Sequence, residues 1–157
     1  MKYAVGYEYN SLTLYYMFLS KFTYQELILL FAPMISGYTM SAFCGPGKSA
    51  GRSVKFRPPA WVFGVVWPIL YILIGLAWIR SKHLTVSFIT LLVLLNLWLL
   101  VYVCQKNKVG GVYIIFLSLL STFYIFVGLD RTTKYILAPL LVWLLFAAFL
   151  NTFEVQN

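Results

Sequence analysis

Charged residues are scarce in this chain, and acidic residues are the scarcest. Only 10% of its 157 residues are charged and only four are acidic, whereas 62% are hydrophobic. Soluble globular proteins average about 25% charged and roughly 45–50% apolar residues, so this chain has too little polar surface to cover a soluble domain. The composition excludes soluble enzymes, disordered chains and nucleic-acid-binding domains. The net charge of +8 is typical of loops that face anionic lipid headgroups, which makes the lipid bilayer the expected partner.

Residues that bind metals or carry covalent chemistry are also few. The sequence contains one histidine, His83, and two cysteines, Cys44 and Cys104, which lie far apart and near predicted membrane boundaries. One His, two separated Cys and no adjacent carboxylate do not make a recognisable metal site. We interpret all three as ordinary boundary residues, and we predict no metal site, no catalytic residue and no required cofactor.

Long runs without charge are what the sequence does contain. Five successive runs of 19 to 23 residues lack Asp, Glu, Lys and Arg, and about 20 residues of α-helix cross a bilayer core. Backbone groups in lipid must be satisfied internally, which leaves helices or closed barrels, and the short alternating segments of a barrel are missing. The predicted fold is an all-α integral membrane protein, a five-transmembrane-helix bundle. Its helices are expected at roughly 27–46, 59–79, 83–104, 109–129 and 134–153.

The chain divides into three parts. Residues 1–26 hold six of the twelve tyrosines and predict an interfacial N-terminal segment, because tyrosine favours the headgroup zone. A signal sequence is the alternative, although no small-residue cleavage site follows the apolar stretch Leu12–Leu19. The transmembrane domain occupies 27–153, and 154–157 form a short tail.

The loops predict how the helices are connected. Three short turns follow the second, third and fourth helices, so helices two to five are expected to be antiparallel neighbours. The long basic loop 45–57 is the exception. The twelve basic residues divide six and six between the two membrane sides, and the four in this loop favour the cytoplasm for it. The five charge-free runs contain no acid, which argues against an ion-coupled transporter.

Seven residues of the predicted helix 59–79 share one face. Placed at 100° per residue, they fall within an arc of about 120°. They are Trp61, Gly64, Trp67, Pro68, Tyr71, Gly75 and Trp78. Small and aromatic residues on one stripe are typical of a protein interior or a ligand pocket, and a packing seam without a ligand is the alternative. The opposite positions are expected to face lipid or another subunit, and they are Val62, Val65, Ile69 and Ile72.

Two further positions concern the third predicted helix. Asn96 places an amide near mid-membrane, where it either bonds a neighbouring helix or holds a polar group of a ligand. Trp98 lies about 200° around the helix from Asn96, so the two are not expected to serve one pocket. Trp98 and the small-residue pair Gly37 and Ser41 are expected to form the surface of a homodimer.

The helix 59–79 resembles the second helix of the translocator protein family, also called the TspO/MBR, tryptophan-rich sensory or peripheral benzodiazepine receptor family. The positions that match this family's pattern are Pro58, Pro59, Trp61, Gly64, Val66, Trp67, Leu70 and Tyr71. The last predicted helix also fits, through Pro139, Leu141, Trp143, Phe146, Ala147, Leu150 and Asn151. Leu95 and Asn96 match in the third helix. One departure is Phe56, which stands where the family usually has Trp.

This resemblance implies a five-helix bundle with a pocket that opens towards the long loop. The family binds porphyrins, sterols such as cholesterol, and benzodiazepine-type drugs. Carried over by position, the ligand-binding candidates are Phe56, Trp61, Asn96, Trp143 and Ala147. Secondary candidates are Lys55 and Arg57 for ligand carboxylates, and Trp67 and Tyr71 for aromatic contacts.

The expected function is a membrane receptor or carrier of a flat hydrophobic ligand, with a haem-type tetrapyrrole as one such ligand. We expect the ligand between helices 59–79 and 134–153, beneath loop 45–57. One alternative is an enzyme of light-dependent tetrapyrrole degradation, which Phe56 in place of Trp makes less favoured. The other is a structural membrane subunit without a ligand. The resemblance is compatible with a mitochondrial outer membrane, an endomembrane or a bacterial membrane.

Overall fold

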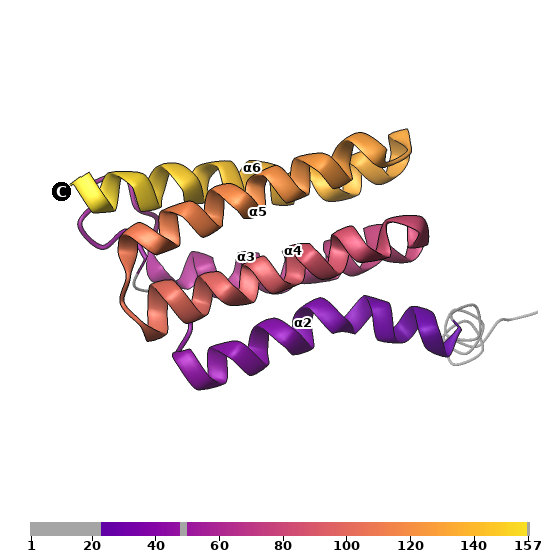
Figure 1. Cartoon of the computed structure of the whole chain (residues 1–157), viewed down its shortest axis with the longest axis horizontal. Helices are drawn as coiled ribbons and strands as arrows, with labels where there is room; N and C mark the ends of the chain where they lie inside the picture. Colours follow the sequence, from indigo (N-terminus) through magenta and orange to yellow (C-terminus); the bar gives the residue numbers. More distant parts are fainter. Residues whose placement is uncertain (1–22, 48–49, 157) are drawn as a thin grey trace, which may run out of the picture.

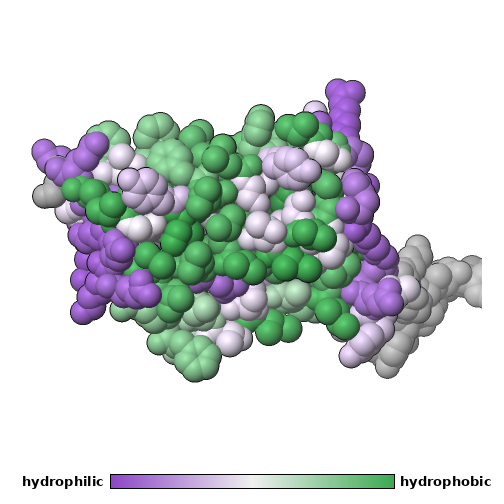
Figure 2. All heavy atoms as spheres, in the orientation of Figure 1, coloured by the Kyte–Doolittle hydropathy of each residue, from purple (hydrophilic) through white to green (hydrophobic). Residues whose placement is uncertain are grey.

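Five long helices make up the computed structural model, which describes residues 23–47 and 50–156. The spans are α2 (Tyr24–Cys44), α3 (Ala60–Arg80), the composite segment Lys82–Cys104, α5 (Lys108–Gly128) and α6 (Arg131–Gln156). They lie side by side (Figure 1), and each is long and apolar enough to cross a membrane. Hydrophilic residues gather at the two ends of the bundle, with hydrophobic residues between them (Figure 2). The predicted five-helix membrane fold is confirmed, whereas most of the predicted interfacial segment, residues 1–22, lies outside the described residues.

Side-chain caps set the ends of two helices beyond the charge-free runs. The Thr23 hydroxyl accepts from the Glu26 N–H and the Glu26 carboxylate accepts from the Thr23 N–H, so this capping box starts α2 at Tyr24. Asp130 accepts from two backbone N–H groups in the first turn of α6. At its other end α6 continues through Gln156, so the predicted tail begins inside the helix, and a carboxylate, Glu154, lies on a membrane helix.

The third span is not one uniform helix. It starts with a 3₁₀ turn, η1 (Lys82–Leu84), continues as α4 (Thr85–Trp98) and ends as a π-helix, η2 (Leu99–Cys104). The N–H of Gln105 donates to the carbonyl of Leu100 at 3.0 Å, which is the five-residue spacing of a π-helix. Such wide turns are rare and often mark functional positions.

The helices pack in a closed order that differs from their order in the chain. α3 packs between α2 and α6, α5 lies between α6 and α4, and α4 with η2 closes the order against α2. The expected pairing of consecutive helices therefore holds for α4 with α5 and for α5 with α6. It is wrong for α3 and α4 along their lengths, because the turn between them fixes only their ends, where Trp78 stacks on Phe88.

The two cysteines are bonded to each other, which corrects their interpretation as unrelated boundary residues. Cys44 ends α2 and Cys104 ends η2, and their disulfide joins positions 60 residues apart, with Cα atoms 4.9 Å from each other. The bond ties α2 to the third span on the membrane side that carries the long loop. Helix packing that no sequence spacing reveals brings the two sulfurs together.

Candidate functional site

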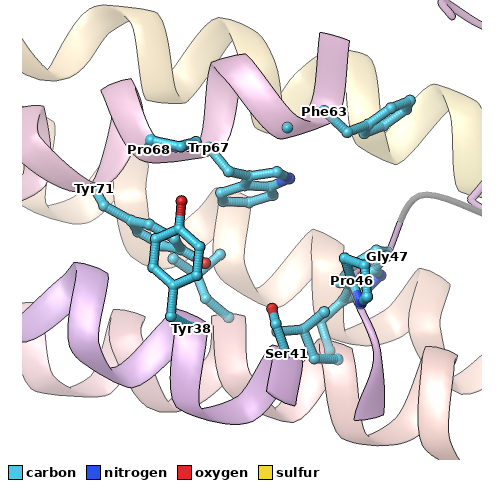
Figure 3. A pocket seen from close by; sticks show the side chains of 13 residues that line it. Tyr38, Ser41, Pro46, Gly47, Phe63, Trp67, Pro68 and Tyr71 are labelled. Atoms are coloured by element: carbon cyan, nitrogen blue, oxygen red, sulfur yellow. The ribbon is translucent and has the colours of Figure 1, made fainter. Parts of the chain in front are cut away.

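A cavity of about 390 Å³ lies between α2, α3 and the third span, next to the start of the long loop. Its volume falls within the roughly 300–1,000 Å³ of small-molecule sites. Figure 3 shows the side chains from these elements around it. The lining residues are Gly37, Tyr38, Ser41, Pro46, Gly47, Phe63, Gly64, Trp67, Pro68, Tyr71, Leu95, Trp98 and Leu99.

The described lining of the cavity is uncharged and has aromatic walls. Trp67 and Tyr71 from α3 have ring centroids 5.6 Å apart, and Trp98 lines the cavity from α4. The hydroxyls of Tyr38, Ser41 and Tyr71 and the indole nitrogen of Trp67 are the polar groups seen around it (Figure 3). Among the lining residues that the structure describes, only the two tyrosines are ionisable. This arrangement suits a flat apolar molecule that carries a few hydrogen-bonding groups.

Glycines bring the helices close enough to enclose this space. A Cβ on Gly37 of α2 would lie 2.2 Å from the Tyr71 hydroxyl oxygen, so only glycine lets α2 lie against that ring. Pro68 of α3 lies within the helix and has no N–H to donate to the preceding turn. The sequence therefore shapes the α2–α3 side of the cavity through a residue without a side chain and a residue without a backbone donor.

The beginning of the long loop packs on the Trp98 wall. A Cβ on Gly47 would approach the Trp98 ring to 2.8 Å, so the loop backbone lies directly against that ring. Trp98 also contacts η2 and α6. Its ring stacks on Tyr102 at 4.9 Å between centroids, and its Nε1–H donates to Asn151 Oδ1 at 3.3 Å. Three elements therefore fix this wall.

The predicted α3 face is only partly correct. Gly64, Trp67, Pro68 and Tyr71 do line the cavity, and Gly75 and Trp78 are buried in helix packing. Trp61 is the exception, because it is 67% exposed in the first turn of α3 and lines no part of the cavity. Of the positions expected to face outward, Val65 and Ile69 are exposed, while Val62 and Ile72 are half-buried.

Three of the predicted ligand contacts lie elsewhere, along the outer α3–α6 side. Phe56 is half exposed. Its ring makes edge-type contacts with Phe146 and Phe153 of α6, with centroids 6.5 and 5.5 Å apart. The Trp143 ring packs against Phe63 with centroids 5.6 Å apart. Because Phe63 lines the cavity, Trp143 lies behind the cavity wall. Ala147 is buried. The cavity therefore does not lie between α3 and α6, where we had expected the ligand.

The third span contributes Trp98, and not Asn96, to the cavity. Trp98 is buried and lines the cavity, whereas Asn96 is half-buried outside it. The Asn96 amide donates to the Leu92 carbonyl at 2.8 Å, and its Oδ1 is buried with no hydrogen-bond partner among the described residues. As expected, the two residues do not share this pocket, but the one that lines it is Trp98.

The basic candidates do not reach into the cavity. Lys55 is exposed on the loop. The Arg57 Nε–H donates to the Ala50 carbonyl at 2.6 Å, and its guanidinium lies 5.3 Å from the centroid of the Phe63 ring. Arg57 therefore holds the loop on the start of α3, which is a structural contact next to the cavity wall.

Sequence reasoning missed the contribution of α2. Gly37, Ser41 and Trp98 are the residues expected on a homodimer surface. All three line the cavity instead. Their small-residue spacing was a real signal of close packing, but the partner is α3 in the same chain. The homodimer stays a prediction, but the residues that suggested it lie around the cavity instead.

Comparison with known proteins gives the same family as the residue pattern. A family model described as TspO/MBR family matches residues 27–155. A tryptophan-rich protein TspO of Archaeoglobus fulgidus is 32% identical over 106 residues, 61% of this chain and 69% of that protein. A tryptophan-rich sensory protein of Cereibacter sphaeroides is 28% identical over 140 residues, 76% of this chain and 88% of that protein. A tryptophan-rich protein TspO of Chlorobaculum tepidum is 26% identical over 110 residues, 62% of this chain and 70% of that protein.

Proposed function

The chain belongs to the TspO/MBR family, and from this premise we propose that it is a membrane receptor or carrier of a flat, largely apolar ligand. The ligand occupies the cavity between α2, α3 and the third span. The observation that carries the proposal is the neutral, aromatic-walled cavity of about 390 Å³ inside a multi-pass membrane bundle. A porphyrin-type tetrapyrrole, a sterol or a benzodiazepine-type drug shares the required chemistry, which is an extended apolar body with few polar groups.

Two features of the cavity support a flat ligand. Trp67 and Trp98 offer indole rings, and a ring stacked on either gains burial as well as aromatic contact. The volume lies at the lower end of the usual range for small-molecule sites, so a tetrapyrrole would fill the cavity and extend through its opening. Tyr38 lines the cavity and its ring is exposed, so its hydroxyl (Figure 3) would meet a polar edge of the ligand.

Substitution of two tryptophans in one helix tests the proposal. Trp67→Ala removes a cavity wall, whereas Trp61→Ala removes an exposed indole two turns away. Stacking and burial at one ring contribute about 1–3 kcal/mol, so Trp67→Ala is expected to weaken binding of a water-soluble porphyrin roughly five- to a hundredfold. Trp61→Ala is expected to leave the affinity within about twofold. The measurement is quenching of tryptophan fluorescence by the porphyrin in mild detergent.

A third variant decides between the cavity and the outer α3–α6 side. Trp143→Ala alters the aromatic cluster formed by Phe56, Phe63, Trp143 and Phe146. A loss of affinity in Trp143→Ala but not in Trp67→Ala would move the ligand to that cluster. Equal affinity in wild type, Trp67→Ala and Trp143→Ala would mean that the ligand binds at neither site, and an absence of saturable binding would favour a structural subunit. Porphyrin breakdown products formed under illumination would favour the degradative enzyme.

A further inference from the structure

Glu154 is a buried carboxylate at the end of α6 that the proposed binding site does not itself contain. Its side chain is 3% exposed, although an isolated carboxylate is costly to remove from water. Three partners from three other segments surround it. They are the Gly51 N–H at 2.7 Å, the Tyr102 hydroxyl, and the Lys108 ammonium at 3.2 Å.

One arm of this network reaches the cavity wall. The Tyr102 hydroxyl donates to Glu154 Oε2, and the Tyr102 ring stacks on Trp98 with an angle of 9° between the planes. Trp98 in turn lines the cavity. A rigid chain of two stacked rings therefore connects the carboxylate to the surface that a ligand would touch.

The other arm reaches the long loop. The Gly51 N–H donates to the same oxygen, Glu154 Oε2, and Gly51 adopts a positive φ of 72° that favours glycine. A Cβ at this position would lie 2.5 Å from the Leu150 side chain, so the loop backbone rests directly on α6. Four residues earlier, Gly47 packs on Trp98. The carboxylate therefore holds the loop and the ring wall together.

We infer that Glu154 is a positioning residue of the ligand site, which fixes the Trp98 wall through Tyr102 and fastens the loop beside it through Gly51. This inference rests on the proposed function for its effect on affinity. The ion pair with Lys108 uses the other oxygen, Oε1, and offsets the charge. The two hydrogen bonds to Oε2 carry the positioning.

The division of roles between the two oxygens defines the variants. Glu154→Gln can keep an oxygen at the Oε2 position, which accepts from both Gly51 and Tyr102, and it loses only the ion pair. Glu154→Leu has a similar size and accepts nothing, so the Gly51 N–H and the Tyr102 hydroxyl both lose their carboxylate acceptor in a buried site. Lys108→Met removes the ion pair alone. Glu26→Gln is the matched control, because Glu26 pairs with Lys82 at the opposite end of the bundle.

Two measurements follow in mild detergent, hydrogen exchange of the peptide that contains Gly51 and titration with a water-soluble porphyrin. We expect Glu154→Leu to speed exchange at Gly51 and to weaken porphyrin binding roughly five- to thirtyfold, in line with unpaired buried donors. Glu154→Gln, Lys108→Met and Glu26→Gln are expected to stay within about threefold of wild type. A purely structural role would instead lower the melting temperature and leave the affinity of the folded molecules unchanged.

The outcomes separate the inference from the proposed function. If Glu154→Leu folds and binds porphyrin like wild type, the positioning role is overturned. If wild type binds no porphyrin, the proposed function fails. The inference is then tested separately in Glu154→Leu, by hydrogen exchange at Gly51 and by acrylamide quenching of tryptophan fluorescence. If neither differs from wild type, the inference is overturned. If Glu154→Leu does not fold, Tyr102→Phe tests the ring arm. It keeps the stacked ring and removes the hydroxyl, and an unchanged affinity would refute that arm.

Discussion

Two helix backbones approach each other closely at Gly75, and replacing this glycine by alanine tests what holds α2 on α3. A Cβ on Gly75 would lie 2.3 Å from the carbonyl oxygen of Leu30 and 2.7 Å from its Cα. An ordinary contact begins near 3.4 Å, so the helices must separate by roughly 1 Å to admit a methyl group. Both obstacles are backbone atoms, which cannot move aside by a change of rotamer.

The expected cost follows from this separation. A gap of 0.5–1 Å forfeits about a quarter to a half of the dispersion energy across a contact, and overpacked sites typically lose about 1–3 kcal/mol. Alanine regains up to about 1 kcal/mol of helix propensity. We therefore expect Gly75→Ala to lower the free energy of unfolding by about 2 kcal/mol, a factor of roughly 30 in the equilibrium constant.

Gly128→Ala provides the matched control. Its new Cβ would meet only the flexible end of the Leu84 side chain, at 3.3 Å, so we expect the free energy of unfolding to stay within about 0.5 kcal/mol of wild type. Both variants would be unfolded with SDS from a mild detergent and followed by circular dichroism. The reasoning fails if Gly75→Ala is as stable as wild type, or if Gly128→Ala loses as much.

Two further predictions concern the ends of the bundle. Cys44→Ser removes the disulfide with Cys104, which closes a loop of 60 residues. We expect the free energy of unfolding to fall by about 2–4 kcal/mol. Dithiothreitol should lower the melting temperature of wild type to that of the variant and leave the variant unchanged. Alkylation of membranes under non-reducing conditions should find the bond only if the loop side faces an oxidising compartment. The hydroxyl and N–H groups of Thr133 and the N–H of Thr132, which bond to Asp130, hold the pKa of that carboxyl below its ordinary value. The stabilisation is therefore present at neutral pH and is lost as pH falls through the lowered pKa. We expect the melting temperature of Asp130→Ala to lie a few degrees below that of wild type at pH 7, and by a smaller margin at pH 3. An equal difference at both pH values would contradict this prediction.

The number and length of the spans could be predicted from the sequence because the bilayer imposes them. Charge is expensive in hydrocarbon and a helix rises by a fixed amount per residue, so five charge-free runs could form only five spans. Helical periodicity also gave correct angles between side chains, as for Trp67 with Tyr71 on one face of α3. The family pattern of Pro, Trp, Gly and Tyr in α3 identified the helix that contributes most residues to the cavity.

The direction in which the faces of α2 and of the third span turn was decided by tertiary structure alone. Lipid and protein interior are both apolar, so hydropathy does not tell which arc turns inward. This is why Trp98, which is expected on an outer surface, instead lines the cavity. The same limit hid the packing of Gly37 on Tyr71, which brings α2 into the cavity wall. The disulfide between Cys44 and Cys104 and the bond from Gly51 to Glu154, 103 residues apart, depend on the closed packing order of the helices. Contacts at such separations are fixed by how rigid helices fit together, and no local pattern of residues encodes that fit.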